Sequence, residues 1–410
     1  MTISPIGHGG KGKGFRLFGG DEAGRLTALR YVVGAALLCG VVLSKNLWLP
    51  MARTFPRAPL VVALYGKFVT PFEYLLSGLL ATALAASLFA RRPAKYLAAS
   101  IVALVLLTLS DQTRLQPWVY QYLVLLTLVA LHARRGDVER PAVVSLFAAR
   151  LVVASLYFWG GAQKLNYSFG HEVLAQLLAP VQGLVTLGEA QLSALGIAVA
   201  EMFTGCGLLL KRTRKLCVWL ALAMHALILG LLIAEGRNSV VWVWNAALAL
   251  AVVVLFSCAD APGRRVAAEW RAGGASARVS LTLAALYATL PLLSFWGRWD
   301  MYLSGALYSG NTAVAVVRVG EREYARLPAA AQRQVFRTKS GELMLPLFEW
   351  SMAELNVPPY PEARAFRQVA REVCRWTGDD DRTQLITKER PAVLDGSYVV
   401  SRAGCRQLGE

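Results

Sequence analysis

The chain has 410 residues, 56% of them hydrophobic, and its mean hydropathy is +0.45. This apolar content exceeds that of an ordinary soluble protein and predicts a membrane protein. The net charge of +17 does not indicate nucleic-acid binding, because the Lys and Arg residues lie in short clusters between apolar runs and are not interleaved with aromatic residues.

Residues 1–26 are Gly-rich and basic, and we expect them to form a disordered cytoplasmic segment. Nine apolar runs follow, and most of them reach the ~20 residues that cross ~30 Å of hydrocarbon. The runs lie at 27–49, 69–90, 94–110, 118–133, 142–162, 189–210, 216–234, 240–257 and 279–297. The predicted fold class is therefore an all-α polytopic membrane helix bundle of about nine transmembrane helices, over residues 27–299.

Basic clusters fall on alternate connections between these runs, as the positive-inside rule requires of cytoplasmic loops. The clusters are Arg91-Arg92 with Lys95, Arg134-Arg135 with Arg140, Lys211-Arg212 with Arg214-Lys215, and Arg264-Arg265 with Arg271 and Arg278. The connection at 50–68 departs from this pattern, because it lies on the other side and carries Arg53, Arg57 and Lys67. Nine crossings from a cytoplasmic N-terminus place residues 300–410 outside, and the high Ala, Leu and Arg usage favours a bacterial inner membrane.

Residues 300–410 are predicted to form a small α+β extracytoplasmic domain. Residues 312–319 and 396–401 have the β-branched composition of strands, and residues 361–373 have helical periodicity after a proline. Cys374 and Cys405 in this domain could form a disulfide in an oxidising compartment, or remain two free thiols. No two of the six cysteines have Cys-x-x-Cys spacing, so no metal site is predicted.

Polar residues at the outer ends of the helices form the candidate substrate-binding set, flanked by aromatic residues. The set comprises Asp111, Arg114, Trp118, Tyr120, Gln163, Asn166, Trp242 and Asn245. An interfacial belt that anchors the helices uses similar residue types and is the alternative interpretation.

Two ionisable groups lie deeper, where hydrocarbon makes a charge costly. Glu201 is about midway along the sixth helix and His225 about midway along the seventh, each roughly 15 Å from a helix end at 1.5 Å per residue. Because these helices are antiparallel neighbours in sequence, the two side chains could form a hydrogen bond that lowers the cost of burying both. The pair is either structural or a proton relay.

Several segments resemble the HTTM family, whose members are membrane domains related to the vitamin K-dependent gamma-carboxylase. The resemblance covers residues 27–310 and rests on residues 111–118, Tyr157-Phe-Trp-Gly-Gly-Ala-Gln-Lys-Leu-Asn166, Met224-His225, residues 242–245 and residues 294–300. It implies that Lys164 is the catalytic base that deprotonates a vitamin K hydroquinone-like quinol, and desolvation of a lysine favours the neutral form that a base requires. The alternative is a Lys164 that stays positively charged and only anchors the helix end. Tyr120 stands where the carboxylase has a histidine.

The sequence thus predicts a membrane enzyme that binds a quinol or another lipophilic small molecule among membrane lipids. Lys164, His225 and Glu201 would be its catalytic residues. The alternative is a non-catalytic membrane factor whose extracytoplasmic domain assists the maturation or export of a secreted peptide or protein.

Overall fold

The computed structural model describes residues 21–49, 53–60, 70–133, 142–178, 187–236, 238–257, 263–271, 274–378, 382–390, 392 and 395–409. Two expectations fall outside these residues. They are the disorder of residues 1–20 and the basic cluster at Arg134, Arg135 and Arg140. The disorder predicted for the rest of the 1–26 segment is wrong for residues 22–26, which begin α1 after the N-cap Asp21.

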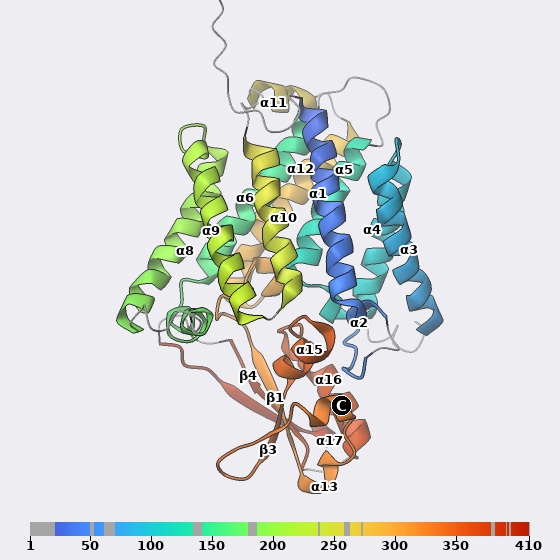
Figure 1. Ribbon diagram of the computed structural model, residues 1–410, viewed down its shortest axis with the longest axis vertical. Helices are drawn as coiled ribbons and strands as arrows, with labels where there is room; N and C mark the ends of the chain where they lie inside the picture. Colours follow the sequence, from blue (N-terminus) through green and yellow to red (C-terminus); the bar gives the residue numbers. More distant parts are fainter. Residues whose placement is uncertain are drawn as a thin grey trace, which may run out of the picture.

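Each predicted apolar run coincides with a helix, and the long helices lie side by side in a bundle (Figure 1). The helices are α1 (Glu22–Leu43), α3 (Thr70–Phe89), α4 (Ala94–Ser110), α5 (Pro117–Ala133), α6 (Val143–Gln163), α8 (Leu187–Leu209), α9 (Arg214–Glu235), α10 (Ser239–Phe256) and α12 (Ala275–Thr289). The 3-10 helix η6 (Leu290–Trp296) continues α12. Short elements occupy the connections: α2 (Lys45–Trp48), η3 (Gln112–Arg114), the π-helix η4 (Phe169–Val173), α7 (Leu174–Leu177) and α11 (Gly263–Arg271).

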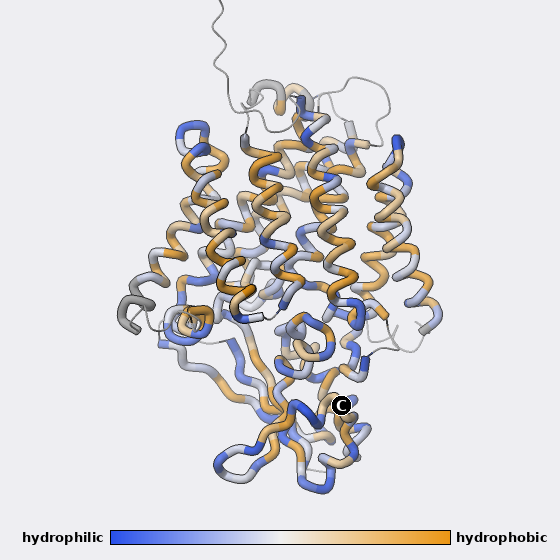
Figure 2. The backbone as a smooth tube through the Cα atoms, in the orientation of Figure 1, coloured by the Kyte–Doolittle hydropathy of each residue, from blue (hydrophilic) through white to orange (hydrophobic). Residues whose placement is uncertain are grey.

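Six helical stretches among the described residues are long and apolar enough to cross a membrane. They are Glu22–Leu43, Pro71–Phe89, Val143–Gln163, Arg214–Glu235, Ser239–Phe256 and Ala275–Trp296. Three further apolar stretches, Ala94–Ser110, Pro117–Ala133 and Ser193–Leu209, are shorter. The apolar residues form a broad middle zone of the bundle, and hydrophilic residues gather at its two ends (Figure 2). This arrangement is compatible with an integral membrane protein, and the count of nine spans stays a prediction.

The C-terminal residues form an antiparallel sheet at one end of the bundle, and α11 lies at the opposite end (Figure 1). The five strands follow the order β2-β3-β1-β4-β5. Their bounds are β1 Val314–Val319, β2 Phe336–Arg337, β3 Leu343–Pro346, β4 Gln384–Lys388 and β5 Val400–Gly404. The central strand β1 alternates in burial, with Ala315, Val317 and Val319 facing the core. The helices of this region are α13 (Glu321–Tyr324), α14 (Ala329–Gln332), α15 (Leu347–Leu355), α16 (Ala363–Thr377) and α17 (Cys405–Gly409).

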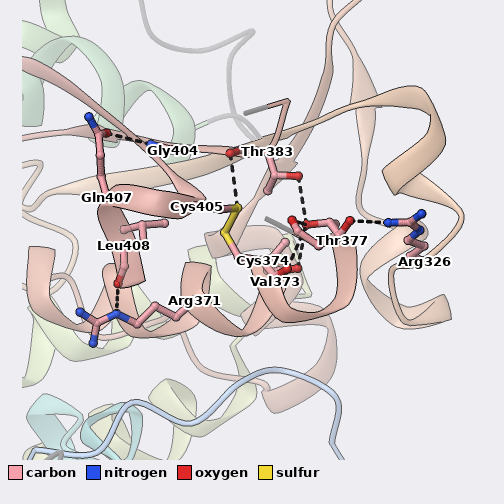
Figure 3. Close-up of a disulfide and its surroundings, with 11 residues drawn as sticks. Arg326, Arg371, Val373, Cys374, Thr377, Thr383, Gly404, Cys405, Gln407 and Leu408 are labelled. Atoms are coloured by element: carbon pink, nitrogen blue, oxygen red, sulfur yellow. Dashed lines mark hydrogen bonds between the residues drawn. A yellow bond between two sulfur atoms is a disulfide. The ribbon is translucent and has the colours of Figure 1, made fainter. Parts of the chain in front are cut away.

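A disulfide joins Cys374 near the end of α16 to Cys405 at the start of α17 (Figure 3). The pairing considered from the sequence is therefore present in the structure. Arg371 of α16 also donates to the carbonyl oxygen of Leu408 in α17. Both links fasten the last helix of the chain to α16.

The sheet region shares one hydrophobic core with the helix bundle. Trp350 of α15 is fully buried, and its ring meets the Phe55 ring, which precedes α3, with 4.8 Å between centroids. Asn356 donates to the carbonyl oxygen of Leu43 at 3.1 Å and to Ser239 at 2.8 Å. The sheet region is thus held against the end of the bundle by apolar packing and by hydrogen bonds.

Candidate functional site

Helices α6 and α8 approach each other closely because glycines face the contact. A Cβ atom on Gly161 would lie 2.4 Å from the Ala198 carbonyl oxygen, and one on Gly205 would lie 2.6 Å from the Ala154 carbonyl oxygen. Small residues at such contacts let helix backbones pack closely in membranes. This packing fixes the register of the two helices and the positions of the side chains beside it.

The register brings Lys164, which directly follows α6, against Glu201 of α8. The Lys164 amine lies 2.6 Å from Glu201 Oε2 and also donates to the Gly160 carbonyl oxygen at 3.3 Å. The side chains are only 14% and 7% exposed, so the ion pair is largely withdrawn from solvent. A partner at this distance compensates much of the desolvation cost of each charge.

His225 has different partners from those that the sequence predicts. Its Nε2 lies 2.5 Å from the Tyr157 hydroxyl and its Nδ1 lies 2.9 Å from Asn245 Oδ1. The Asn245 amide nitrogen donates to the Val241 carbonyl oxygen, so its oxygen faces His225. His225 Nδ1 therefore carries the proton and Nε2 accepts from Tyr157.

The predicted hydrogen bond between Glu201 and His225 is accordingly replaced by two separate contacts. The reason is the close packing of α6 on α8, which presents Lys164 to Glu201, while Tyr157, seven residues before Lys164 and on the same face of α6, meets His225. Lys164, Glu201, Tyr157, His225 and Asn245 thus form a polar cluster inside the bundle, which we call the inner cluster.

Gln163 and Asn166 flank Lys164 but point to another part of the chain. Gln163 donates to Ser294 at 2.9 Å and accepts from Asn311 at 2.7 Å. Asn166 donates to the Ser309 carbonyl oxygen at 2.8 Å. Both residues fasten the end of α6 to the segment that leads into the sheet, and Lys164 alone of the three faces the inner cluster.

Asp111 and Arg114 lie in a second buried network at the end of the bundle that carries the sheet. Asp111 forms an ion pair with Arg53 at 2.7 Å and accepts from the backbone of Ala58 and Thr113. Burial alone raises the pKa of the Asp111 carboxyl, but Arg53, Arg114 and these two N–H groups outweigh it and hold the pKa below its ordinary value.

Arg114 is equally occupied by protein groups. It forms an ion pair with Glu73 at 3.2 Å and donates to the carbonyl oxygens of Leu47 and Leu107. Glu73 in turn lies 2.9 Å from Arg57. Two of the three basic residues that depart from the positive-inside pattern, Arg53 and Arg57, are therefore counter-ions of Asp111 and Glu73, and Lys67 lies outside the described residues.

The aromatic candidates are spread over separate contacts. Trp118 is buried, and its ring meets those of Trp48 and Tyr122. Tyr120 stacks on Tyr287 with 5.1 Å between ring centroids. Trp242 packs against the core from a partly buried position. None of these contacts joins the inner cluster.

Sequence reasoning missed Tyr157 as a site residue, although it begins the segment that ends at Asn166. The signal that could have identified Tyr157 is its polar hydroxyl group on an apolar helix, directly before the stretch Phe-Trp-Gly-Gly. Among the described residues, no group of three or more His, Cys, Asp or Glu side chains could hold a metal ion.

No protein-family model matches the chain, and no curated protein or solved structure matches it.

Proposed function

We propose that the chain is a membrane enzyme that abstracts a proton from a lipophilic substrate, and that Lys164 is the base. The observation that carries this proposal is the ion pair between Lys164 and Glu201, held at 2.6 Å inside an apolar bundle. Intramembrane ionisable residues are costly and mark functional sites by default. The substrate class is a lipid-soluble molecule with an acidic O–H group, such as a quinol, as the family resemblance of residues 27–310 implies.

Lys164 must lose a proton before it can act as a base, and Glu201 can accept that proton, so no group outside the pair is needed for this step. Transfer of one proton from the Lys164 ammonium to the Glu201 carboxylate leaves a neutral amine and a carboxylic acid. The amine then takes the proton of the substrate O–H group and becomes an ammonium again, beside the substrate anion. Only O–H and N–H bonds form and break, and the ammonium stabilises the anion electrostatically.

The remaining members of the inner cluster supply a route for the proton on Glu201. In this route the proton passes from Glu201 to Tyr157, whose hydroxyl contacts the His225 ring, and that ring bonds to Asn245. Hydroxyl and imidazole groups can both accept and donate protons, so such a series can carry a proton along the bundle. His225 and Asn245 are positioning and relay groups in this proposal, and Lys164 alone contacts the substrate.

We also propose that the sheet region faces an oxidising compartment outside a bacterial inner membrane. Its disulfide is typical of such compartments, and the basic connections at Arg91-Arg92 and Lys211-Arg212 lie at the opposite end of the bundle (Figure 1). In this orientation Lys164 lies near the outer membrane surface.

The test is mass spectrometry of lipids extracted from the full-length protein, purified as wild type, Lys164→Met and the control Lys215→Met. Lys215 is an exposed lysine at the basic end of α9. We expect a lipid with an acidic O–H group to co-purify with wild type and with the control and to be depleted at least tenfold from Lys164→Met. Absence of such a lipid from wild type, together with no binding of added menaquinol or ubiquinol, would overturn the proposal.

The docked sheet region favours a second candidate, a non-catalytic factor that binds a secreted peptide. Its tests must use point substitutions rather than deletion of residues 300–410. Deletion would strip Gln116 of its bond to the Pro358 carbonyl oxygen and Gln112 of its bond from Arg364. A phenotype that survives Lys164→Met and is lost on substitution of exposed sheet residues would favour this candidate over the enzyme.

A further inference from the structure

An arginine near the start of α1 has no hydrogen-bond or ion-pair partner within the part of the chain that the structure describes. Arg30 is only 7% exposed, yet neither kind of bond joins its side chain to another described residue. Its Nε–H group is enclosed and lacks an acceptor, whereas the two Nη groups keep access to the surface. A cation on a membrane helix is costly unless it is paired. Arg30 therefore indicates a missing anion.

Two other buried arginines near this end of the bundle do have partners. Arg25, also on α1, donates to the Val254 carbonyl oxygen of α10 at 2.7 Å, and Arg150 of α6 donates to the Leu255 carbonyl oxygen at 2.7 Å. These carbonyls lie in the last turns of α10, where helix carbonyls lack partners within the helix and attract cations. The fold thus explains both of these arginines, and it does not explain Arg30.

The accessible part of the Arg30 side chain lies at the lipid-facing side of α1. Its Cζ atom is 4.7 Å from the centroid of the Tyr31 ring. Tyr31 is 46% exposed on a helix that is long and apolar enough to cross a membrane, so its ring faces lipid when the helix spans the bilayer. A ligand can therefore reach the guanidinium from the lipid side rather than from the core of the bundle.

Further cations lie at the level of Arg30. Gly34, one turn further along α1 and on the same side, packs against α3, because a Cβ atom on Gly34 would lie 2.8 Å from Leu88 Cδ2. Helix α3 ends directly after Leu88, and Arg91 and Arg92 form the exposed turn that follows. This turn and Arg30 are each about one helical turn from the contact between α1 and α3. Among the described residues, neither Arg91 nor Arg92 has an ion-pair partner.

We infer that Arg30 binds the phosphate of an anionic phospholipid beside α1 and α3, at the end of the bundle opposite the sheet (Figure 1). A guanidinium can donate two parallel N–H bonds to a phosphate. The Arg91-Arg92 turn adds positive charge, which favours an anionic over a zwitterionic head group. Phe89, 88% exposed beside this turn, offers apolar surface to the acyl chains, which a free phosphate ion lacks. The inference does not depend on the role proposed for Lys164.

Native mass spectrometry of the full-length, detergent-purified protein tests this inference. The protein is titrated with phosphatidylglycerol and with phosphatidylcholine of identical acyl chains, and the phosphatidylglycerol titration is repeated in excess inorganic phosphate. We expect the first phosphatidylglycerol to bind about tenfold more tightly than phosphatidylcholine and to resist displacement by inorganic phosphate. Equal affinities for the two lipids would overturn the inference. Displacement by inorganic phosphate would also overturn it, because the ligand would then be a soluble anion.

Variants separate a site at Arg30 from the attraction of the overall charge. Arg30→Gln should weaken binding of the first phosphatidylglycerol about tenfold and leave phosphatidylcholine binding unchanged. The control Arg212→Gln removes the same charge from the exposed turn between α8 and α9, at the same end of the bundle, and should change neither affinity. If the control weakens phosphatidylglycerol binding as much as Arg30→Gln does, the inference fails.

A second variant alters only exposed residues and so tests the same site without touching the buried arginine. Combined replacement of Arg91 and Arg92 by glutamine should weaken phosphatidylglycerol binding about fivefold. If this variant binds phosphatidylglycerol as tightly as wild type, the turn does not contribute to the site, and the inference is wrong even where Arg30→Gln fails to fold.

Discussion

Gly161 on α6 and Ala198 on α8 meet backbone to backbone, since a Cβ atom on Gly161 would fall 2.4 Å from the Ala198 carbonyl oxygen. This contact sets the distance at which Lys164 meets Glu201. The ion pair and the glycine contact are therefore two parts of one helix interface.

Gly161→Ala should separate the two helices and destabilise the protein. Overpacking of a close contact costs about 1–3 kcal/mol, so we expect a lower midpoint in thermal unfolding of the detergent-purified protein. Gly196→Ala is the matched control on α8, because a Cβ atom there meets nothing within 4 Å. Equal midpoints for the two variants would show that the α6–α8 approach is looser than described here.

The Lys164–Glu201 pair should behave as a coupled unit in a double-mutant cycle. Lys164→Met or Glu201→Leu alone leaves a buried charge without its partner, which costs about 3–5 kcal/mol, whereas the double variant removes both charges and should recover most of that stability. Denaturant unfolding of the four proteins measures the coupling. Additive losses would mean that the two charges do not interact. Recovery of stability without recovery of lipid binding would separate the structural role of the pair from its function.

Stability should fall steeply in acid because of Asp111. Its pKa is held below the ordinary value of 3.8, so its stabilising contribution is fully present above pH 3.8 and is lost as the pH falls from there through the lowered pKa. Asp111→Asn should lower the free energy of unfolding at neutral pH by about 3–5 kcal/mol. Its unfolding midpoint should also fall less than that of wild type as the pH is lowered. Unfolding midpoints from pH 7 down to about pH 2 measure both effects, because the predicted loss lies below pH 3.8.

Asp21→Asn is the control for this series. Asp21 caps α1, and asparagine caps a helix about as well as aspartate. The unfolding midpoint of this variant should fall in acid as steeply as that of wild type. If the unfolding midpoint of Asp111→Asn falls in acid as steeply as that of wild type, the assignment of this pH dependence to Asp111 is wrong.

Replacement of both Cys374 and Cys405 by serine should destabilise the C-terminal region. The bond closes a segment with a sequence separation of 31, and the chain-entropy model gives about 3–4 kcal/mol for a loop of this size. Limited proteolysis should cleave the variant faster near α17 than wild type. Cys206→Ser changes an exposed, unpaired thiol and should have no such effect. Thiol labelling that modifies Cys374 in the unreduced protein would contradict the pairing.

Apolar composition predicted the helices well, because each long run has no other stable state in lipid. The predicted strand at 312–319 corresponds to β1, and the predicted helix at 361–373 corresponds to α16. The strand expected at 396–401 begins only at Val400, because Asp395 accepts from Ser397 in a turn and Gly396 has a positive φ. The strands β2, β3 and β4 were not predicted.

Partners across the bundle could not be predicted, because helix rotation and register are set by packing rather than by hydropathy. Glu201 and His225 are buried, but their positions along the helices did not reveal that glycines would bring Lys164, at the end of α6, to Glu201. Likewise, the positive-inside rule does not account for Arg53 in the connection at 50–68. Its ion pair with the buried Asp111 accounts for it, but this pairing could not be predicted from the sequence.

The hydrogen bonds between the sheet region and the bundle imply an order of biogenesis. Phe55 and Gln116 reach their final partners, Glu354 and the Pro358 carbonyl oxygen, only after the ribosome has made most of the chain. A nascent chain that stops after α12 has all its apolar helices in place, yet it leaves donors and aromatic surface exposed beside the membrane. We therefore expect such a truncated chain to be degraded faster in cells than the full-length protein, because its unpaired polar groups and exposed apolar surface lower its stability.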